Sequence, residues 1–212
     1  MTDQQRSDIH DYDNMVTVLV GKEEKRFTLH QDAVCAKSKF FKAACHKQWL
    51  EWQKRIVRLP EVEAATFQPY CHWIYFDNLP ASTCVVASPK SDKHDEHMSL
   101  IKLHLLGDTL DDVGLRDKAT LRLLASMQSY DMPLSIPNLK LIYESTPSGS
   151  LLRKMVVDLV ISSVDQAFFK VYVDSSPAEF VREVAVAALG AVSRSALARV
   201  DIDQYMEVKK RA

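Results

Sequence analysis

Two Cys–His pairs, Cys45–His46 and Cys71–His72, have the residue types needed to bind a metal ion or to carry a reaction. Adjacent residues on a helix point about 100° apart, so a neighbouring pair rarely ligates one ion. Structural zinc sites instead use the spacings C-x2-4-C and H-x3-5-H, and the sequence contains neither. We therefore interpret Cys45 and Cys71 as small core residues, and His46 and His72 as surface residues.

The remaining candidates for chemistry are equally weak. His94–Asp95–Glu96–His97 lies in a polar stretch and reads as a solvated run of charges. Asp111–Asp112 lies at a junction between two expected helices, where helix capping explains both carboxylates. The sequence has only five Gly, contains no G-x-S-x-G motif and has no glycine-rich loop to hold a phosphate. It predicts no catalytic residue, no metal site, no cofactor and no small-molecule substrate.

Composition narrows the class of protein. The chain has 212 residues, of which 47% are hydrophobic and 26% charged, and its formal net charge is −1. That charge would attract neither nucleic acid nor an anionic membrane. No window approaches the roughly 20 apolar residues of a membrane span, and the polar N-terminus does not resemble a signal peptide. The four cysteines are expected to be reduced, so we predict an intracellular protein, in the cytoplasm or the nucleus. The cysteines are Cys35, Cys45, Cys71 and Cys84.

The elements that position these residues begin after a polar segment, 1–14, that we predict to be disordered. Residues 15–21 and 26–30 alternate as two strands of a β-hairpin. Residues 31–46 have helical periodicity, and Ser38 could cap a second short helix that begins near residue 39. A further strand is predicted within 55–62.

The second half of the chain is predicted to be mostly helical. Phe67, Cys71 and Ile74 line one face of a helix that continues through Pro69. Residues 79–98 lose this periodicity and are predicted to be a flexible insertion. Two helices follow from residue 99, joined near Asp111–Asp112. After a proline-rich connection come two more helices, the second opened by the capping box Ser176–Glu179.

Four of these residues, with a fifth further along the chain, carry a family pattern. His30, Val34, Ser38 and Phe41 match H-x-x-x-L-x-x-x-S-x-x-F, with Val in place of Leu, and Asp108 stands in "LHLLGDTL", similar to L-Y-x-L-A-D-x-L. The sequence thus resembles the BTB/POZ domain family over residues 15–126, and its divergence and insertion resemble fungal members that stand alone. The resemblance implies an α+β fold, in which a cluster of α-helices caps a small three-stranded sheet. It leaves 127–212 as a helical C-terminal extension.

The resemblance also implies a function without chemistry. BTB/POZ domains bind other proteins, so the chain is expected to be an interaction module and not an enzyme. The resemblance implies that His30 and Ser38 satisfy backbone groups around the first helices and that Phe41 lies in the core. In adaptors of cullin ubiquitin ligases, an apolar-x-Glu element follows this helix. Trp49 and Glu51 stand in that register, with Trp52 beside them.

Two alternatives remain open at this stage. The chain could be a substrate adaptor for a cullin-based ubiquitin ligase, or a scaffold or oligomerisation factor in transcriptional or signalling complexes that do not contact a cullin. Trp49 and Trp52 could equally pack over the edge of the sheet. Monomer and weak homodimer are both compatible with the sequence, because the N-terminal segment shows no strand pattern for exchange.

Overall fold

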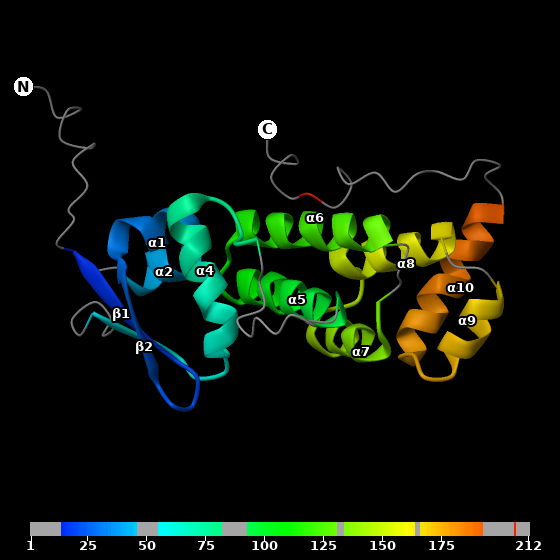
Figure 1. The fold of residues 1–212 in the computed structure, drawn as a ribbon, viewed down its shortest axis with the longest axis horizontal. Helices are drawn as coiled ribbons and strands as arrows, with labels where there is room; N and C mark the ends of the chain where they lie inside the picture. Colours follow the sequence, from blue (N-terminus) through cyan, green and yellow to red (C-terminus); the bar gives the residue numbers. More distant parts are fainter. Residues whose placement is uncertain are drawn as a thin grey trace, which may run out of the picture.

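The elements of the fold fall into one small sheet and a series of helices. The computed structural model describes residues 14–45, 55–81, 93–130, 134–163, 166–192 and 206. The strands are β1 (Met15–Val20), β2 (Lys25–His30) and β3 (Ile56–Leu59). The helices are α1 (Gln31–Lys37), α2 (Lys39–Ala44), α4 (Ala64–Phe76), α5 (Lys93–Thr109), α6 (Val113–Tyr130), α7 (Ile136–Ser145), α8 (Leu151–Ser163), α9 (Gln166–Val173) and α10 (Ala178–Val192). Figure 1 shows an elongated molecule with the sheet, α1, α2 and α4 at one end, α5 and α6 in the middle, and α9 and α10 at the other end.

The sheet has the strand order β2-β1-β3, with β1 antiparallel to β2 and parallel to β3. Met15 pairs with His30 and Thr17 pairs with Ile56, so β1 begins, β2 ends and β3 begins at the same end of the sheet. Alternate side chains of β1 face the core, as the period of two in a strand requires. These are Val16, Val18 and Val20. The predicted hairpin, the third strand and the α+β class are therefore confirmed.

Helix α4 continues through Pro69, as the sequence predicted, and buries Phe67 and Trp73 against the sheet and the first helices. It ends where Asp77 adopts a left-handed conformation, with φ of 52°, and donates its N–H to the carbonyl of Trp73. This cap satisfies one of the carbonyls that a helix end leaves unpaired.

Helix α5 begins earlier than the sequence indicated. Of the predicted insertion, 79–98, Leu79 is buried, residues 93–98 form the first turns of α5, and residues 82–92 lie outside the described residues. His97 is fully buried, and its Nε2 lies 3.0 Å from the hydroxyl of Ser126 on α6. It belongs to the same helix face as the buried Leu100 and Ile101. Because residues 93–98 are mostly polar, the helical spacing of His97, Leu100 and Ile101 was not recognised from the sequence.

The C-terminal extension contains more helices than predicted. The first of the two helices expected after the proline-rich connection is α8, whereas α7 lies within that connection and α9 was not expected. The predicted capping box of α10 is wrong. The hydroxyl of Ser176 donates to the carbonyl of Tyr172 at 2.8 Å, and the carboxylate of Glu179 accepts from Arg153 at 2.6 Å.

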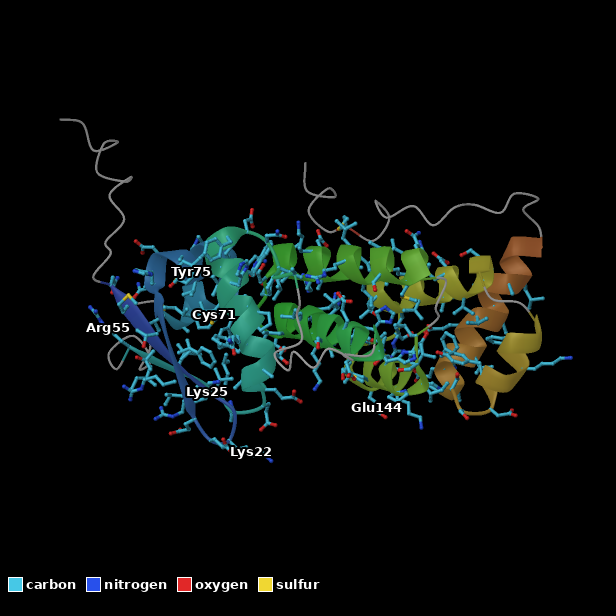
Figure 2. All side chains as sticks on the ribbon, viewed as in Figure 1. Lys22, Lys25, Arg55, Cys71, Tyr75 and Glu144 are labelled. Atoms are coloured by element: carbon cyan, nitrogen blue, oxygen red, sulfur yellow. The ribbon has the colours of Figure 1, made fainter. Side chains whose placement is uncertain are left out.

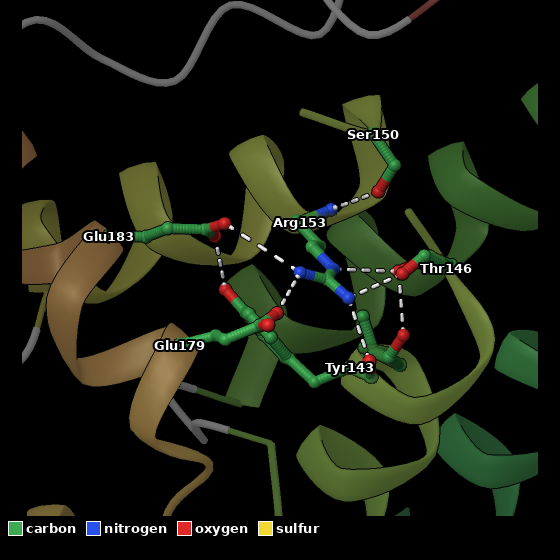
Figure 3. Close-up of polar contacts among 7 residues, drawn as sticks. Tyr143, Thr146, Ser150, Arg153, Glu179 and Glu183 are labelled. Atoms are coloured by element: carbon green, nitrogen blue, oxygen red, sulfur yellow. Dashed lines mark hydrogen bonds and ion pairs between the residues drawn. The ribbon is translucent and has the colours of Figure 1, made fainter. Parts of the chain in front are cut away.

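Arg153 of α8 joins α7, α8 and α10 (Figure 3). Its side chain is almost fully buried, and its Nη1 lies 2.6 Å from Glu179 and 3.8 Å from Glu183. Its Nη2 donates to the carbonyls of Tyr143 and Thr146, which end α7. A buried guanidinium needs this many partners, because each unmet donor would be costly away from water. These contacts fix α7, α8 and α10 relative to one another.

One hydrophobic cluster runs through both halves of the chain. Its members extend from Val16 in β1, through Leu100 in α5, to Phe180 in α10. Helix α7 packs against both α5 and α8, and so connects the extension to the first domain. The extension thus buries apolar side chains in the same core as the preceding domain.

Candidate interaction surface

Ser38 fixes the helix pair α1–α2, which precedes the predicted partner-binding residues Trp49, Glu51 and Trp52. It is the N-cap of α2, where its hydroxyl accepts from the N–H of Phe41 at 3.1 Å, as the sequence predicted. The same hydroxyl donates to the carbonyl of Leu110 at 2.5 Å, in the turn between α5 and α6. Because Ser38 is buried, these two hydrogen bonds define the position of α2.

The other pattern residues have structural surroundings. Val34 and Phe41 are fully buried between α1, α2 and the core. Asp108 on α5 is half-exposed and accepts from the guanidinium of Arg116 on α6 at 2.5 Å. Val34 and Phe41 therefore lack the exposure that a direct partner contact would need, whereas Asp108 is open to solvent.

His30 contacts α4 from the end of β2. It precedes α1, but its side chain makes no capping hydrogen bond there. Its Nδ1 instead lies 3.0 Å from the hydroxyl of Tyr75 on α4, and its backbone N–H donates to that hydroxyl at 3.1 Å. The two rings meet edge to face, with centroids 5.7 Å apart. His30 and Tyr75 therefore join the end of the sheet to the end of α4.

The C-terminal turn of α4 exposes two aromatic side chains. Tyr75 is 45% exposed and Phe76 is 67% exposed, whereas Trp73 is buried. Phe76 is covered on one side by His72, whose ring centroid lies 4.5 Å away. His72 is itself fixed, because its Nδ1 lies 2.9 Å from the carbonyl of Asn78. Exposed and pre-positioned aromatic rings are typical anchors of protein interfaces.

A buried carboxylate holds α4 in place beneath these rings. Asp112, at the start of α6, accepts from the indole N–H of Trp73 and from the N–H of Leu115, both at 2.9 Å. Burial raises the pKa of the Asp112 carboxyl, and these hydrogen bonds oppose the shift. Lys37 lies over the Trp73 ring, 4.9 Å from its centroid, and pairs with Asp77 at 2.5 Å. The predicted capping role of Asp112 is confirmed.

The predicted partner-binding residues Trp49, Glu51 and Trp52 lie outside the described residues. The described residues on either side of this segment, Cys45 and Arg55, are fixed by backbone hydrogen bonds. Cys45 donates its N–H to the carbonyl of Phe41 at 2.8 Å, and the carbonyl of Arg55 accepts from Thr17 at 2.9 Å.

Arg55 thus stands at the end of the sheet where His30 also lies. Figure 2 shows Arg55 and Tyr75 at one end of the molecule, with Lys22 and Lys25 toward the opposite end of the hairpin. We call the residues at this end the sheet-end surface; it is formed by the half-buried His30 and the exposed Arg55, Tyr75 and Phe76. Tyr75 and Phe76 were not predicted as surface residues from the sequence. Their only signal was that two aromatic residues fall outside the core-facing set Phe67, Cys71 and Ile74.

The described residues contain no group of three or more His, Cys, Asp or Glu side chains able to hold a metal ion. His46, one of the four residues considered for such a site, lies outside them. Burial raises the pKa of the Cys71 thiol to about 12, which keeps it protonated near neutral pH. Within the described part of the chain, none of the helices is both long and apolar enough to cross a bilayer.

Comparison with protein families gives a match to the first part of the chain. The model of the BTB/POZ domain family matches residues 4–103, which include the sheet, α1, α2, α4 and most of α5. No curated protein matches this chain.

Proposed function

We propose that this chain, whose residues 4–103 match the BTB/POZ domain family of protein–protein interaction modules, recruits its partner through the sheet-end surface and the segment 46–54. The observation that carries this proposal is the exposure of Tyr75 and Phe76 at the C-terminal turn of α4, where Tyr75 contacts His30 at the end of the sheet. A few exposed aromatic side chains held by their neighbours can supply most of the binding energy of an interface.

We further propose that the partner is a cullin, so that the protein is an adaptor of a ubiquitin ligase. The support is a matter of register. Glu51 stands ten residues after Phe41 and eight before Leu59 (51 − 41 = 10; 59 − 51 = 8), as in cullin adaptors of the family. Phe41 and Leu59 are both buried, so the two ends from which this spacing is counted are fixed in the core. Trp49 would then provide the apolar anchor, Glu51 the orienting carboxylate and Trp52 a neighbouring contact.

The second candidate is a scaffold or oligomerisation factor that does not contact a cullin. The exposed Tyr75 and Phe76 support this alternative as well, because their exposure does not require that Trp49 or Glu51 binds a partner. A weak homodimer through the sheet-end surface is one form of this alternative.

A pull-down with the N-terminal domain of a recombinant cullin separates these functions. The native full chain should bind, and the double variant Trp49→Ala/Glu51→Ala should lose binding, because it lacks both the anchor and the carboxylate. A Lys22→Ala variant is the matched control, since Lys22 is exposed at the opposite end of the hairpin. Failure of the native chain to bind, or equal binding by the double variant, would exclude the adaptor role.

A further inference from the structure

The outer edge of strand β2 has backbone groups that no described strand uses. In the order β2-β1-β3, β2 lies at one edge of the sheet. Thr17 of β1 donates its N–H to the carbonyl of Arg55, so Thr17 faces the side of β3. The same period continues to Gly21, which donates to the carbonyl of Leu59. The alternate residues of β1 therefore face β2, because a central strand turns successive residues to opposite neighbours.

This pattern determines which residues of β2 face outward. The β1 residues that face β2 stand opposite Lys25, Phe27 and Leu29 in the antiparallel register. Arg26 and Thr28 lie between these, so they direct their N–H and C=O groups away from β1. His30 follows the same period, and its outward N–H donates to the hydroxyl of Tyr75 at 3.1 Å. Within the described part of the chain, Arg26 and Thr28 have no such partner, and both are exposed.

The charged side chains along this edge are basic. Lys25 and Arg26 are exposed, and the strand contains no acidic residue. In the adjoining turn, Glu24 is already in an ion pair with an arginine of β3 at 3.2 Å. The exposed Lys22 and Glu23 of that turn offset each other, and Figure 2 shows Lys22 and Lys25 at this end of the hairpin. Arg26 is thus the charge that a strand beside β2 would meet.

On the core side, this edge ends in an aromatic ring that is not fully covered. Phe27 packs on Phe67 of α4, with ring centroids 5.0 Å apart, but it stays half-buried, whereas Leu29 is buried. Successive side chains of a strand point to opposite faces of the sheet. A strand added beside β2 would therefore direct every second side chain toward Phe27 and the others toward the face of Arg26. The matching ligand alternates apolar and acidic residues.

A second copy of β2 fits this edge poorly. Two β2 strands paired through their outer edges would bring Lys25 and Arg26 of each copy close to the same residues of the other. Like charges on adjacent strands destabilise their pairing, and charged edge strands are a common means of preventing self-association. The edge thus disfavours its own copy and accepts a strand of opposite charge.

We propose that the outer edge of β2 binds an extended segment of a partner protein, in which acidic and apolar residues alternate. The segment adds antiparallel to β2, the slightly more stable arrangement, and pairs with the N–H and C=O groups of Arg26 and Thr28. Its acidic side chains lie beside Arg26, and its apolar side chains cover the exposed part of Phe27. The backbone pairs supply affinity, and the side chains select the sequence. This site does not depend on what segment 46–54 binds.

Calorimetric titration of the full chain with synthetic peptides tests this edge. The probe is the peptide TVEIDVEIT, blocked at both ends, and the first control is TVKIKVKIT, in which lysine replaces each acidic residue. Directly opposite residues of antiparallel strands share a face, so the acidic residues of the probe carry the amides that face β2. The second control is therefore N-methylated at the central aspartate, which removes one donor and keeps the charge. We expect the probe to bind, the lysine peptide not to bind, and the N-methylated peptide to bind about tenfold more weakly.

Variants of the chain test the same edge from the other side. Arg26→Glu should weaken binding of the probe by about tenfold. Lys140→Glu is the matched control, because it makes the same change of charge at an exposed residue of α7, and it should bind as the native chain does. In the native chain, bound probe should slow the exchange of the Arg26 and Thr28 amides, measured by NMR.

The proposal is overturned if the probe does not bind at millimolar concentration, or if the lysine or N-methylated peptide binds as well as the probe. Equal binding of the probe by Arg26→Glu and the native chain, or unchanged exchange at Arg26 and Thr28, would also overturn it. If Arg26→Glu fails to fold by circular dichroism, the control peptides and the amides of the native chain still decide.

Discussion

Polar contacts serve different purposes at the two ends of the molecule. In the extension, Arg153 is 3% exposed, and its guanidinium binds carboxylates and carbonyls from α7 and α10. At the sheet end, Tyr75 and Phe76 keep 45% and 67% of their surface exposed, and their polar neighbours hold them without covering them. Polar groups build the structure at one end, and at the other they position residues for a partner. Breaking the first should affect stability, and breaking the second should affect binding.

The largest effect is expected from Arg153→Met, which keeps much of the side-chain volume and removes the guanidinium. The carbonyls of Tyr143 and Thr146 would lose a donor in the buried junction of α7 and α8. We expect a loss of about 3 kcal/mol in the free energy of unfolding, measured by urea denaturation.

The matched control is Glu179→Gln, because the Glu179 carboxylate is more than half exposed. An exposed carboxylate contributes less, so this variant should lose under about 1 kcal/mol. Equal losses from the two variants would contradict a buried network centred on Arg153.

Trp73→Phe is expected to have the next largest effect. It removes the indole N–H that donates to Asp112 and leaves one oxygen of a buried carboxylate without that bond. The expected loss is about 2 kcal/mol in urea denaturation at neutral pH. The loss should be smaller in an Asp112→Asn background, where no buried charge remains to be stabilised. An unchanged loss in that background would show that ring packing alone is responsible.

The burial of His104 leads us to expect that stability depends on pH, with a smaller effect than those of the variants above. Burial lowers the pKa of His104, and its Nδ1 is bound to the hydroxyl of Thr120 at 2.9 Å, near Arg116, Asp108 and Asp117. The unfolded chain therefore binds the proton more readily, so stability should fall as the pH drops below about 6.5. His104→Gln should show a shallower fall between pH 7.5 and 5.5 in thermal melts. Identical slopes would contradict the assignment to His104.

The smallest effect on stability is expected from Phe76→Ser. An exposed aromatic ring contributes little to folding, so the free energy of unfolding should change by no more than about 0.5 kcal/mol. Binding of a partner at the sheet-end surface should nevertheless weaken by about tenfold, since anchors of an interface typically cost more than 1 kcal/mol when removed. Calorimetric titration of the native and variant chains measures this difference.

Most of the fold could be predicted from the spacing of residues within single helices and strands. The features that were not predicted depend on contacts between residues far apart in the sequence. Val34, Ser38 and Phe41 could be predicted because their roles follow from positions on two short helices and one cap. Glu179 was misread, because a capping box and a partner for a distant arginine look the same in the local sequence.

The contact between His30 and Tyr75 joins residues 45 positions apart, and no local pattern predicts it. His97 was missed for another reason: a buried histidine breaks the rule that the core-facing stripe of a helix is apolar. The proposed roles of Trp49, Glu51 and Trp52 remain predictions.

Hydrogen–deuterium exchange of the full chain, with and without the N-terminal domain of a cullin, tests the central claim most directly. We predict slower exchange in 27–37, 46–54 and 71–78 when the partner is bound, and unchanged exchange in 136–192. Protection confined to 136–192, or no protection at any segment at saturating cullin, would contradict docking at the sheet-end surface.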